Sequence, residues 1–334
     1  MKSIVMQSLA QMVRELVDLL RRLTQFVHFT DRLIVATGFP WTDANVTEVF
    51  DLNDLARICP NLEDFPLTIR EASGGFLANQ MGIICGGFDE NAWNISNQCF
   101  RLDETYSRFE PFANLTYPRS RHAAVEVNGT LWLSGGEPNL KSSTEFLFPD
   151  GSSQIGPEMP VSLRDHCVTI LPDLRAIILG GYNGDEYSNQ TYIYDFIGQK
   201  WNIGDAMNFK RNEFGCSWFH HNALEKTVVM AAGGHDSENN HKSVEFLDLE
   251  MNQWLDGPDL PFDFWYGMSV VRSKRDSLLL IGGYSRLGYQ AKLTELTCDY
   301  EAQACQWTFI ENAELLVPRL YHVSLIVPKN ETNR

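Results

Sequence analysis

The segment Leu279-Leu280-Ile281-Gly282-Gly283 decides the fold, because closely similar segments precede it at regular intervals. Each joins a short apolar run, typical of a buried β-strand, to a glycine pair. The first glycines of successive copies are 45 to 53 residues apart. A repeat of this length is typical of a β-propeller blade. The other copies are Ile83-Ile84-Cys85-Gly86-Gly87, Trp132-Leu133-Ser134-Gly135-Gly136, Ile177-Ile178-Leu179-Gly180-Gly181 and Met230-Ala231-Ala232-Gly233-Gly234, with a degenerate copy at Ile34-Val35-Ala36-Thr37-Gly38.

A strand of alternating polarity follows most glycine pairs after a loop, as in Thr191-Tyr192-Ile193-Tyr194-Asp195. Its closing aspartate is often followed six residues later by an aromatic residue, as in Asp195 to Trp201 and Asp248 to Trp254. We expect the carboxylate to accept hydrogen bonds from backbone amides of a turn. We expect the aromatic ring to fill the gap between neighbouring blades.

Through its glycine pairs, acidic turns and spaced tryptophans, the chain resembles the kelch-repeat family over about residues 32–327. The resemblance implies an all-β protein with a six-bladed kelch-type β-propeller. Blade one departs from the pattern, because Gly38-Phe39 replaces its glycine pair. The placement of Cys59, Cys85 and Cys99 is also similar to that of cysteine-bearing kelch proteins secreted by invertebrates.

The two ends of the repeat region complement each other. Arg32-Leu33-Ile34-Val35 matches the second strand of a unit, and the missing first strand matches residues 318–327. We therefore predict that the C-terminal strand closes blade one, and that deletion of residues 318–334 unfolds or aggregates the protein. Apolar residues at helical spacing predict an amphipathic helix or tail over residues 1–31; the alternative is that this start is not the natural one. Residues 328–334 are predicted to be a short tail.

The charge of the chain restricts its partners. It contains 27 Lys and Arg residues against 43 Asp and Glu residues, a formal net charge of −16. This balance disfavours nonspecific binding to nucleic acids or to anionic membranes. The sequence also lacks an apolar stretch long enough for a membrane helix. We expect a monomer that recognises another protein.

Arginines recur near the start of the first strand of each unit, where propeller strands converge on a central channel. Four of them, Arg70, Arg119, Arg211 and Arg319, stand three residues before Ser73, His122, Phe214 and His322, and Arg164 stands close before His166. The sixth unit has Tyr266 near this place. A ring of guanidinium groups at the channel rim could capture carboxylates of an acidic segment. The alternative is that these arginines tie neighbouring blades together through backbone carbonyls.

The loops after the glycine pairs are the second candidate binding surface. In kelch relatives these loops and the channel rim form the ligand face. Exposed aromatic and arginine side chains are frequent anchors in protein contacts. The ligand-binding candidates here are Tyr182 and Tyr284, and the same loops contribute Phe88, Glu90, Glu137, Asn139, Asn183, His235, Asp236 and Arg286.

Motifs for catalysis or cofactor binding are absent from the sequence. It has no Gly-x-Ser-x-Gly, no phosphate-binding glycine loop and no His-Glu-x-x-His. His220 and His221 are adjacent, so in a strand they point to opposite faces and cannot easily share one ion. We therefore expect no catalytic residues, no metal and no cofactor. The rival prediction is a propeller enzyme for a small anionic sugar, with His122, His166 and His322 near the channel.

Seven cysteines are present, and four of them are expected to form two disulfides. Cys298 and Cys305 flank a probable turn, whereas Cys85 ends one strand and Cys99 begins the next antiparallel strand. Cys59, Cys167 and Cys216 are left without an assigned partner. The alternative is that all seven are reduced and buried.

Six Asn-x-Ser/Thr sequons are predicted glycosylation sites, at Asn45, Asn94, Asn114, Asn128, Asn189 and Asn330. Together with paired cysteines they favour an extracellular, secreted protein. The alternative is a cytoplasmic protein with unused sequons. The sequence thus predicts a noncatalytic protein-recognition module, with an intracellular cytoskeletal or adaptor scaffold as an alternative.

Overall fold

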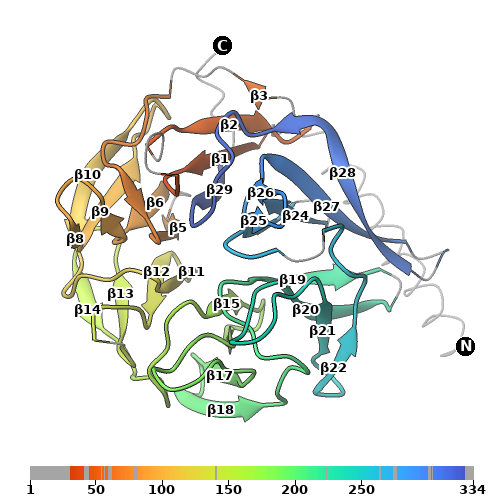
Figure 1. Cartoon of the computed structure of the whole chain (residues 1–334). Helices are drawn as coiled ribbons and strands as arrows, with labels where there is room; N and C mark the ends of the chain where they lie inside the picture. Colours follow the sequence, from red (N-terminus) through yellow and green to blue (C-terminus); the bar gives the residue numbers. More distant parts are fainter. Residues whose placement is uncertain are drawn as a thin grey trace, which may run out of the picture.

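Each glycine pair ends a buried strand, as the repeat predicts, and these strands organise the β-structure (Figure 1). The computed structural model describes residues 31–327, apart from 41–44, 54, 56, 59–61, 79, 80, 140, 223, 263, 264, 274–276, 300, 301 and 303. All regular structure in this part of the chain is β, with no helix. The predicted N-terminal helix over residues 1–31 falls almost wholly outside the described residues.

Six antiparallel four-stranded sheets surround a central axis in Figure 1, and we number them one to six along the chain. Sheet one combines strands from both ends of the described chain, because β29 pairs with β1 in register from Arg32↔Val327 to Ala36↔Val323. Its strands, from the axis outward, are β29 (Val323–Val327), β1 (Arg32–Ala36), β2 (Glu48–Asp51) and β3 (Arg57–Ile58).

The other five sheets are each continuous in sequence and follow the same order from the axis outward. Sheet two contains β5 (Ser73–Leu77), β6 (Met81–Cys85), β9 (Gln98–Leu102) and β10 (Phe109–Asn114). Sheet three contains β11 (Ala123–Val127), β12 (Thr130–Ser134), β13 (Thr144–Leu147) and β14 (Ser153–Ile155). Sheet four contains β15 (Cys167–Ile170), β16 (Arg175–Leu179), β17 (Thr191–Asp195) and β18 (Lys200–Gly204).

Sheets five and six complete the set. Sheet five contains β19 (Gly215–His221), β20 (Lys226–Ala232), β21 (Val244–Asp248) and β22 (Gln253–Asp256). Sheet six contains β23 (Ser269–Arg272), β24 (Leu278–Ile281), β27 (Lys292–Asp299) and β28 (Ala304–Glu314). Two small additional sheets are formed by β4 (Ile69–Arg70), β7 (Phe88–Asp89) and β8 (Asn94–Ile95), and by β25 (Tyr284–Ser285) and β26 (Gly288–Tyr289).

The hydrophobic core lies between the sheets. Six clusters of buried side chains each join two neighbouring sheets, including Leu33 and Phe50 of sheet one with Leu279 and Ile281 of sheet six. The second strand of every sheet is buried on both faces, which explains its continuous apolar sequence. Function is therefore left to the loops and to the residues that face the axis.

The acidic turns form as predicted. Asp195 accepts hydrogen bonds from the backbone N–H groups of Ile197 and Gly198, both at 2.9 Å. The ring of Trp254 is buried, and its Nε1–H donates to the carbonyl of Asp205 at 3.0 Å, so it joins sheet five to the end of sheet four. The predictions for the aspartates and the spaced tryptophans are confirmed at these positions.

Candidate functional site

A residue with left-handed backbone geometry precedes the first strand of every sheet. Their φ angles lie between 53° and 66°. Each donates its backbone N–H to the carbonyl of the equivalent residue in the preceding sheet, at 2.7 to 3.2 Å, and the sixth bond, from Glu71 to Tyr321, returns to the start. These six channel-ring residues are Glu71, Arg121, Asp165, Glu213, Gly267 and Tyr321.

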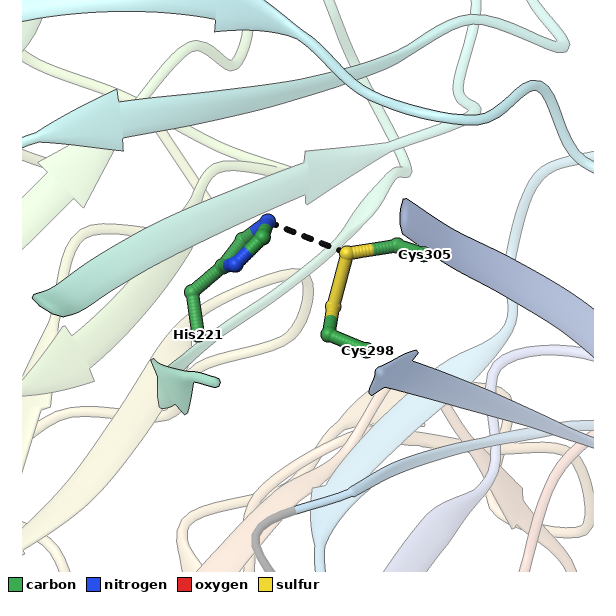
Figure 2. Close-up of side chains that lie close together, drawn as sticks. All are labelled: His221, Cys298 and Cys305. Carbon is green, nitrogen blue, oxygen red and sulfur yellow. Dashed lines mark hydrogen bonds between the residues drawn. A yellow bond between two sulfur atoms is a disulfide. The ribbon is translucent and has the colours of Figure 1, made fainter. Parts of the chain in front are cut away.

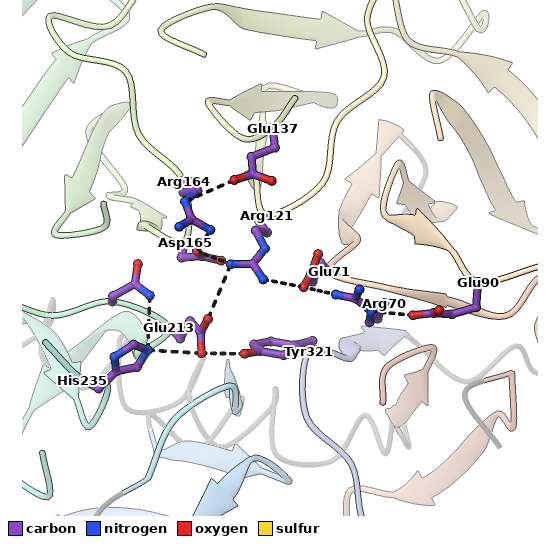
Figure 3. Close-up of polar contacts among 11 residues, drawn as sticks. Arg70, Glu71, Glu90, Arg121, Glu137, Arg164, Asp165, Glu213, His235 and Tyr321 are labelled. Atoms are coloured by element: carbon purple, nitrogen blue, oxygen red, sulfur yellow. Dashed lines mark hydrogen bonds and ion pairs between the residues drawn. The ribbon is translucent and has the colours of Figure 1, made fainter. Parts of the chain in front are cut away.

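The side chains of the channel ring meet at the axis (Figure 3). The Arg121 guanidinium lies 3.0 Å from a carboxylate oxygen of Glu71, 3.1 Å from Asp165 and 3.8 Å from Glu213. The three acidic side chains are only 4 to 8% exposed, whereas Arg121 is 24% exposed. One cation thus faces three nearly buried carboxylates.

A second layer of polar groups surrounds this cluster. Arg70 pairs with Glu71 and with Glu90, and Arg164 lies 3.5 Å from Asp165 and 3.3 Å from Glu137. Glu213 has two further partners: the Tyr321 hydroxyl donates to it at 2.6 Å, and His235 Nε2 lies 3.4 Å from the same carboxylate. Figure 3 shows that these contacts form one connected network.

The network gives the carboxyl groups of Asp165 and Glu213 different pKa values. Burial raises the pKa of Asp165 to about 7, although Arg121 opposes the shift. Burial acts in the same direction on Glu213, but hydrogen bonds from His235 and Tyr321 outweigh it and lower its pKa. Burial alone would lower the pKa of His235, and the contact with Glu213 raises it instead. A proton therefore resides more readily on Asp165 than on Glu213.

A channel cavity of about 150 Å³ lies beside the charged cluster and is lined by the channel-ring residues and their successors in the chain. Among these successors are the predicted residues His122, His166 and His322, each at most 7% exposed. Burial lowers the pKa of each to about 3, so all three are neutral at physiological pH. The three histidines thus line the channel cavity, and their role in ligand binding stays a prediction.

The three imidazoles differ in their hydrogen bonds. Nε2 of His166 lies 2.8 Å from the Ser134 hydroxyl, and Nε2 of His322 lies 2.9 Å from that of Ser269. Both ring nitrogens of His122 lack a partner among the residues that the structure describes. His122 is thus the buried polar group of the cavity with the least hydrogen bonding.

Three of the five predicted arginines do not reach the channel rim. Arg119, Arg211 and Arg319 are at most 1% exposed and lie within sheets three, five and one. Their backbone carbonyls accept hydrogen bonds from the second glycine of the preceding sheet, at 2.7 to 2.8 Å. The prediction that they form a guanidinium ring for a ligand is wrong, because these side chains point back into the sheets. The alternative, a structural tie through backbone carbonyls, describes them.

Each of these arginines forms a buried arginine–glutamate pair with the third strand of its own sheet. All five donors of Arg211 are used, on Glu245, on the hydroxyl and carbonyl of Ser243, and on the Gly233 carbonyl, at 2.5 to 3.1 Å. The pairs are Arg119–Glu145, Arg211–Glu245 and Arg319–Glu48. In sheet six, Trp265 replaces the arginine and donates its Nε1–H to the equivalent carbonyl of Gly282 at 2.6 Å.

A sequence signal for these pairs was present but was not used in the prediction. A glutamate stands in the third strand of the three sheets that carry the buried arginine. The equivalent positions hold Phe100, Tyr192 and Thr294 in sheets two, four and six, whose arginine position holds Ile69, Leu163 and Trp265. The two charged residues therefore occur together or not at all.

The channel ring also requires the glycine pairs. The first glycine of the pair in sheet two, Gly86, has φ 68°, and an added Cβ would lie 2.3 Å from the Arg119 carbonyl oxygen and 2.9 Å from the His122 ring. Any larger residue would therefore push sheet three away from sheet two. This is the physical reason why the glycines mark the repeat.

The two remaining arginines, Arg70 and Arg164, lie at the channel rim as predicted. Each guanidinium stands 4.8 Å from the centre of an aromatic ring, that of Phe88 for Arg70 and that of Tyr182 for Arg164. Both are also held by the acidic residues of the network. They are therefore committed to contacts within the protein.

An aromatic arc lies next to the channel ring, on the loops that follow the glycine pairs. The first loop residue after the pair forms a backbone bridge with the residue just before the channel ring, as Tyr182 does with Arg164 and Tyr284 with Tyr266. Successive ring centres in the arc are 5.2 to 5.7 Å apart. In order, its members are Tyr182, Tyr187, His235, Tyr266, Tyr284, Tyr289 and Phe39.

The structure thus brings the predicted residues Tyr182, Tyr266 and Tyr284 together in the arc. Tyr187, Tyr289 and Phe39 were missed, although Tyr187 pairs with Tyr182 within one loop and Tyr289 pairs with Tyr284 within another. The other loop residues lie around it: Asn139 and Arg286 are exposed, whereas Phe88, Glu90, Asn183 and Asp236 are half-buried.

Three cysteine pairs lie at disulfide-bonding distance. Cys85 and Cys99 face each other across β6 and β9, and Cys298 and Cys305 across β27 and β28, as expected. The third pair, Cys167 with Cys216, links β15 to β19 between sheets four and five. It was left unassigned because its partners come from different repeats. Cys59 lies outside the described residues.

His221 adjoins one of these disulfides (Figure 2). Its Nε2 is 3.0 Å from Cys305 Sγ, and the ligand atoms of His221, Cys298 and Cys305 all lie within 4.8 Å of one another. Such a group could hold a metal ion as free thiolates. In this structure the sulfurs are bonded to each other, and the Leu224 N–H donates to Nδ1 at 3.2 Å, which favours a proton on Nε2. His221 therefore donates toward the sulfur.

The predicted glycosylation sites differ in exposure. Asn94, Asn114 and Asn128 are exposed, and Asn128 opens the two-residue turn between β11 and β12. Asn45 and Asn189 are half-buried, and Nδ2 of Asn189 donates to the Met207 carbonyl at 2.8 Å. Asn330 lies outside the described residues.

Comparison with known proteins supports the repeat assignment. The Kelch motif model matches residues 226–261, which contain β20, β21 and β22. An F-box/kelch-repeat protein of Arabidopsis thaliana is 29% identical over 100 residues, covering 29% of this chain and 23% of the relative. The kelch repeat-containing protein kel-10 of Caenorhabditis elegans is 24% identical over 119 residues, covering 36% and 20%. The chain thus matches about a fifth of the length of these two relatives.

The solved structure of YjhT has the same fold, with a TM-score of 0.71 at 13% identity over 84% of this chain and 95% of that one. Among the residues that our structure describes, none belongs to a helix of the length and hydrophobicity needed to cross a bilayer. The motif match and the curated relatives support a kelch-repeat protein with the β-propeller fold, as the resemblance implied.

Proposed function

We propose that this protein is a noncatalytic recognition module, and that the face carrying the channel mouth and the aromatic arc binds a partner protein. Kelch repeats generally mediate interactions between proteins. The observation that carries the proposal is the aromatic arc itself: seven rings in continuous contact on one side of the channel mouth. Tyrosines supply large contact areas at a low cost in conformational entropy.

The scaffold supports this use of the loops. We propose that the six sheets act as six blades of one propeller over residues 32–327, held by the hydrogen-bond ring of the channel. A rigid frame reduces the ordering cost of binding, so that loop side chains can contribute to affinity. The excess of carboxylates around Arg121 disfavours the rival function, an enzyme for a small anionic sugar.

A display library of linear random peptides, selected on the wild-type protein, tests the proposal. The double substitution Tyr284→Ala with Tyr289→Ala should weaken binding of the selected peptides at least tenfold, because it interrupts the arc. Ile203→Ser is the matched control, since Ile203 is 72% exposed on the outer strand β18. If no selected peptide distinguishes the arc variant from the wild type, the proposed function is wrong.

We also infer that the protein works in an oxidising, extracellular compartment. The three cysteine pairs and the exposed sequons at Asn94, Asn114 and Asn128 support this placement. Peptide mapping of protein expressed through the secretory route, without reduction and with or without glycan removal, is the test. Linked cysteines and occupied asparagines are expected; free thiols and bare asparagines would favour an intracellular scaffold.

A further inference from the structure

We propose that the partner inserts a basic side chain, Lys or Arg, into the channel cavity, where Asp165 and Glu213 receive its charge. The inference rests on the proposed recognition function and names the chemistry of the partner. It reverses the expectation of an acidic partner segment, which depended on a ring of unpaired arginines.

The network holds more carboxylates than cationic groups. Five carboxylates, of Glu71, Glu90, Glu137, Asp165 and Glu213, share the guanidinium groups of Arg70, Arg121 and Arg164. His235, beside Glu213, adds a fourth positive charge only when it is protonated, so the carboxylates remain in excess. A buried carboxylate without a full counter-charge is costly, and a nearby cation lowers that cost. The raised pKa of Asp165 agrees with this imbalance, since a bound proton lowers the negative charge there.

The loops around the channel mouth carry more acidic than basic residues. The loops after the glycine pairs of sheets two to six carry seven acidic residues and three basic ones. The acidic residues are Asp89, Glu90, Glu137, Asp185, Glu186, Asp236 and Glu238, and the basic residues are Lys141, Lys242 and Arg286. This face therefore attracts a basic segment and repels an acidic one.

The size and surroundings of the channel cavity suit a single cationic head group. A cavity of about 150 Å³ is similar in size to an engineered cavity of about 150 Å³ that holds one benzene molecule, so it has room for a side-chain head group. Tyr266 directly precedes the lining residue Gly267, and its ring centre lies 5.4 Å from that of Tyr284. Tyrosine faces attract ammonium and guanidinium groups. The cavity thus suits one cation, with neighbouring partner residues over the aromatic arc.

The composition of the peptides selected on the wild-type protein tests this inference. Arc-dependent peptides should contain a Lys or Arg whose replacement by Gln weakens binding at least tenfold. This change leaves the protein untouched, so it cannot be confused with misfolding. The double substitution Asp165→Asn with Glu213→Gln should weaken binding of the same peptides at least tenfold. Asp150→Asn with Glu225→Gln makes the same two chemical changes in exposed turns at the opposite ends of the strands and should change binding less than twofold.

The outcomes separate the two proposals. If arc-dependent peptides are acidic or neutral, or tolerate Lys or Arg replacement by Gln, the basic-partner inference is wrong and the recognition function stands. If the control pair weakens binding as much as the cavity pair, long-range attraction explains the effect and insertion is wrong. If no peptide depends on the arc, both proposals fail.

Discussion

Arginine–carboxylate contacts occur in two different environments in this protein. The buried arginine–glutamate pairs lie within sheets, whereas Arg121 and its three carboxylates lie beside the channel cavity. Arg211 spends all five donors on partners within sheet five, and neither it nor Glu245 is exposed to solvent. Arg121 divides its charge among three carboxylates beside a cavity and is 24% exposed. Position relative to the channel ring, not residue type, therefore separates a fully buried ion pair from one that borders the cavity.

The largest expected effect comes from breaking a saturated pair. Arg211→Leu should lower the free energy of unfolding by about 3–5 kcal/mol, because it leaves the Glu245 carboxylate buried without a counter-charge. Arg121→Leu should cost less than half as much, since the cavity admits water to the carboxylates left behind. Urea denaturation of both variants measures the difference.

A matched double variant sharpens this test. Arg211→Leu with Glu245→Phe should recover most of the loss, because sheets two and four already hold apolar or aromatic side chains at both positions. Equal losses for Arg211→Leu and Arg121→Leu would show that the two regions do not differ as argued.

The next effect concerns protons on the channel side. The pKa of His122 is about 3 in the folded protein against an ordinary 6.5. The unfolded chain therefore binds more protons as pH falls below 6.5, and the folded state loses stability between pH 6.5 and 3. His122→Phe, which copies Phe214 at the same position of sheet five, should remove about 2 kcal/mol of the stability difference between pH 8 and pH 5.

Thermal or urea unfolding of His122→Phe at the two pH values measures this effect. His166→Phe is the comparison variant, because it also loses the contact with Ser134 and should be less stable than His122→Phe at pH 8. An unchanged pH dependence in His122→Phe would mean that His122 is not buried in neutral form.

An effect of similar size but opposite sign is expected at Asp165. Its raised pKa means that the folded state holds a proton which the unfolded chain releases above its ordinary value of 3.8, so this residue favours folding at low pH and loses that contribution as pH rises toward 7. Asp165→Asn should therefore raise the stability at pH 7 relative to that at pH 5 by about 2 kcal/mol, because it removes the proton that folding takes up. A steeper decline in this variant would contradict the assignment.

The repeat made most of the fold predictable, because its physical cause is local. Gly86 and its equivalents must lack a side chain where the next sheet crosses, so each sheet leaves a visible mark in the sequence. The pairs Cys85–Cys99 and Cys298–Cys305 could be proposed for the same reason, since their partners lie on adjacent strands of one sheet.

The chemistry of the channel was harder to predict. Arg119 and Arg121 are two residues apart, yet one is buried within sheet three and the other faces the axis. The turn between them is set by the left-handed residue at the channel ring, whose position does not show in the sequence except at Gly267. No other sheet has an arginine at the position equivalent to Arg121, so a search for residues that recur in every repeat does not find it.

The ring of backbone hydrogen bonds has a consequence for how such a protein can change. At each of its six positions the main chain donates one hydrogen bond of the ring, while the side chain can be acidic, basic, aromatic or absent, as Glu71, Arg121, Tyr321 and Gly267 illustrate. Backbone atoms of these residues therefore hold the ring together, while their side-chain atoms decide the chemistry of the channel. Evolution or a protein engineer can therefore rewrite the specificity of the channel one side chain at a time while the frame that holds it stays the same.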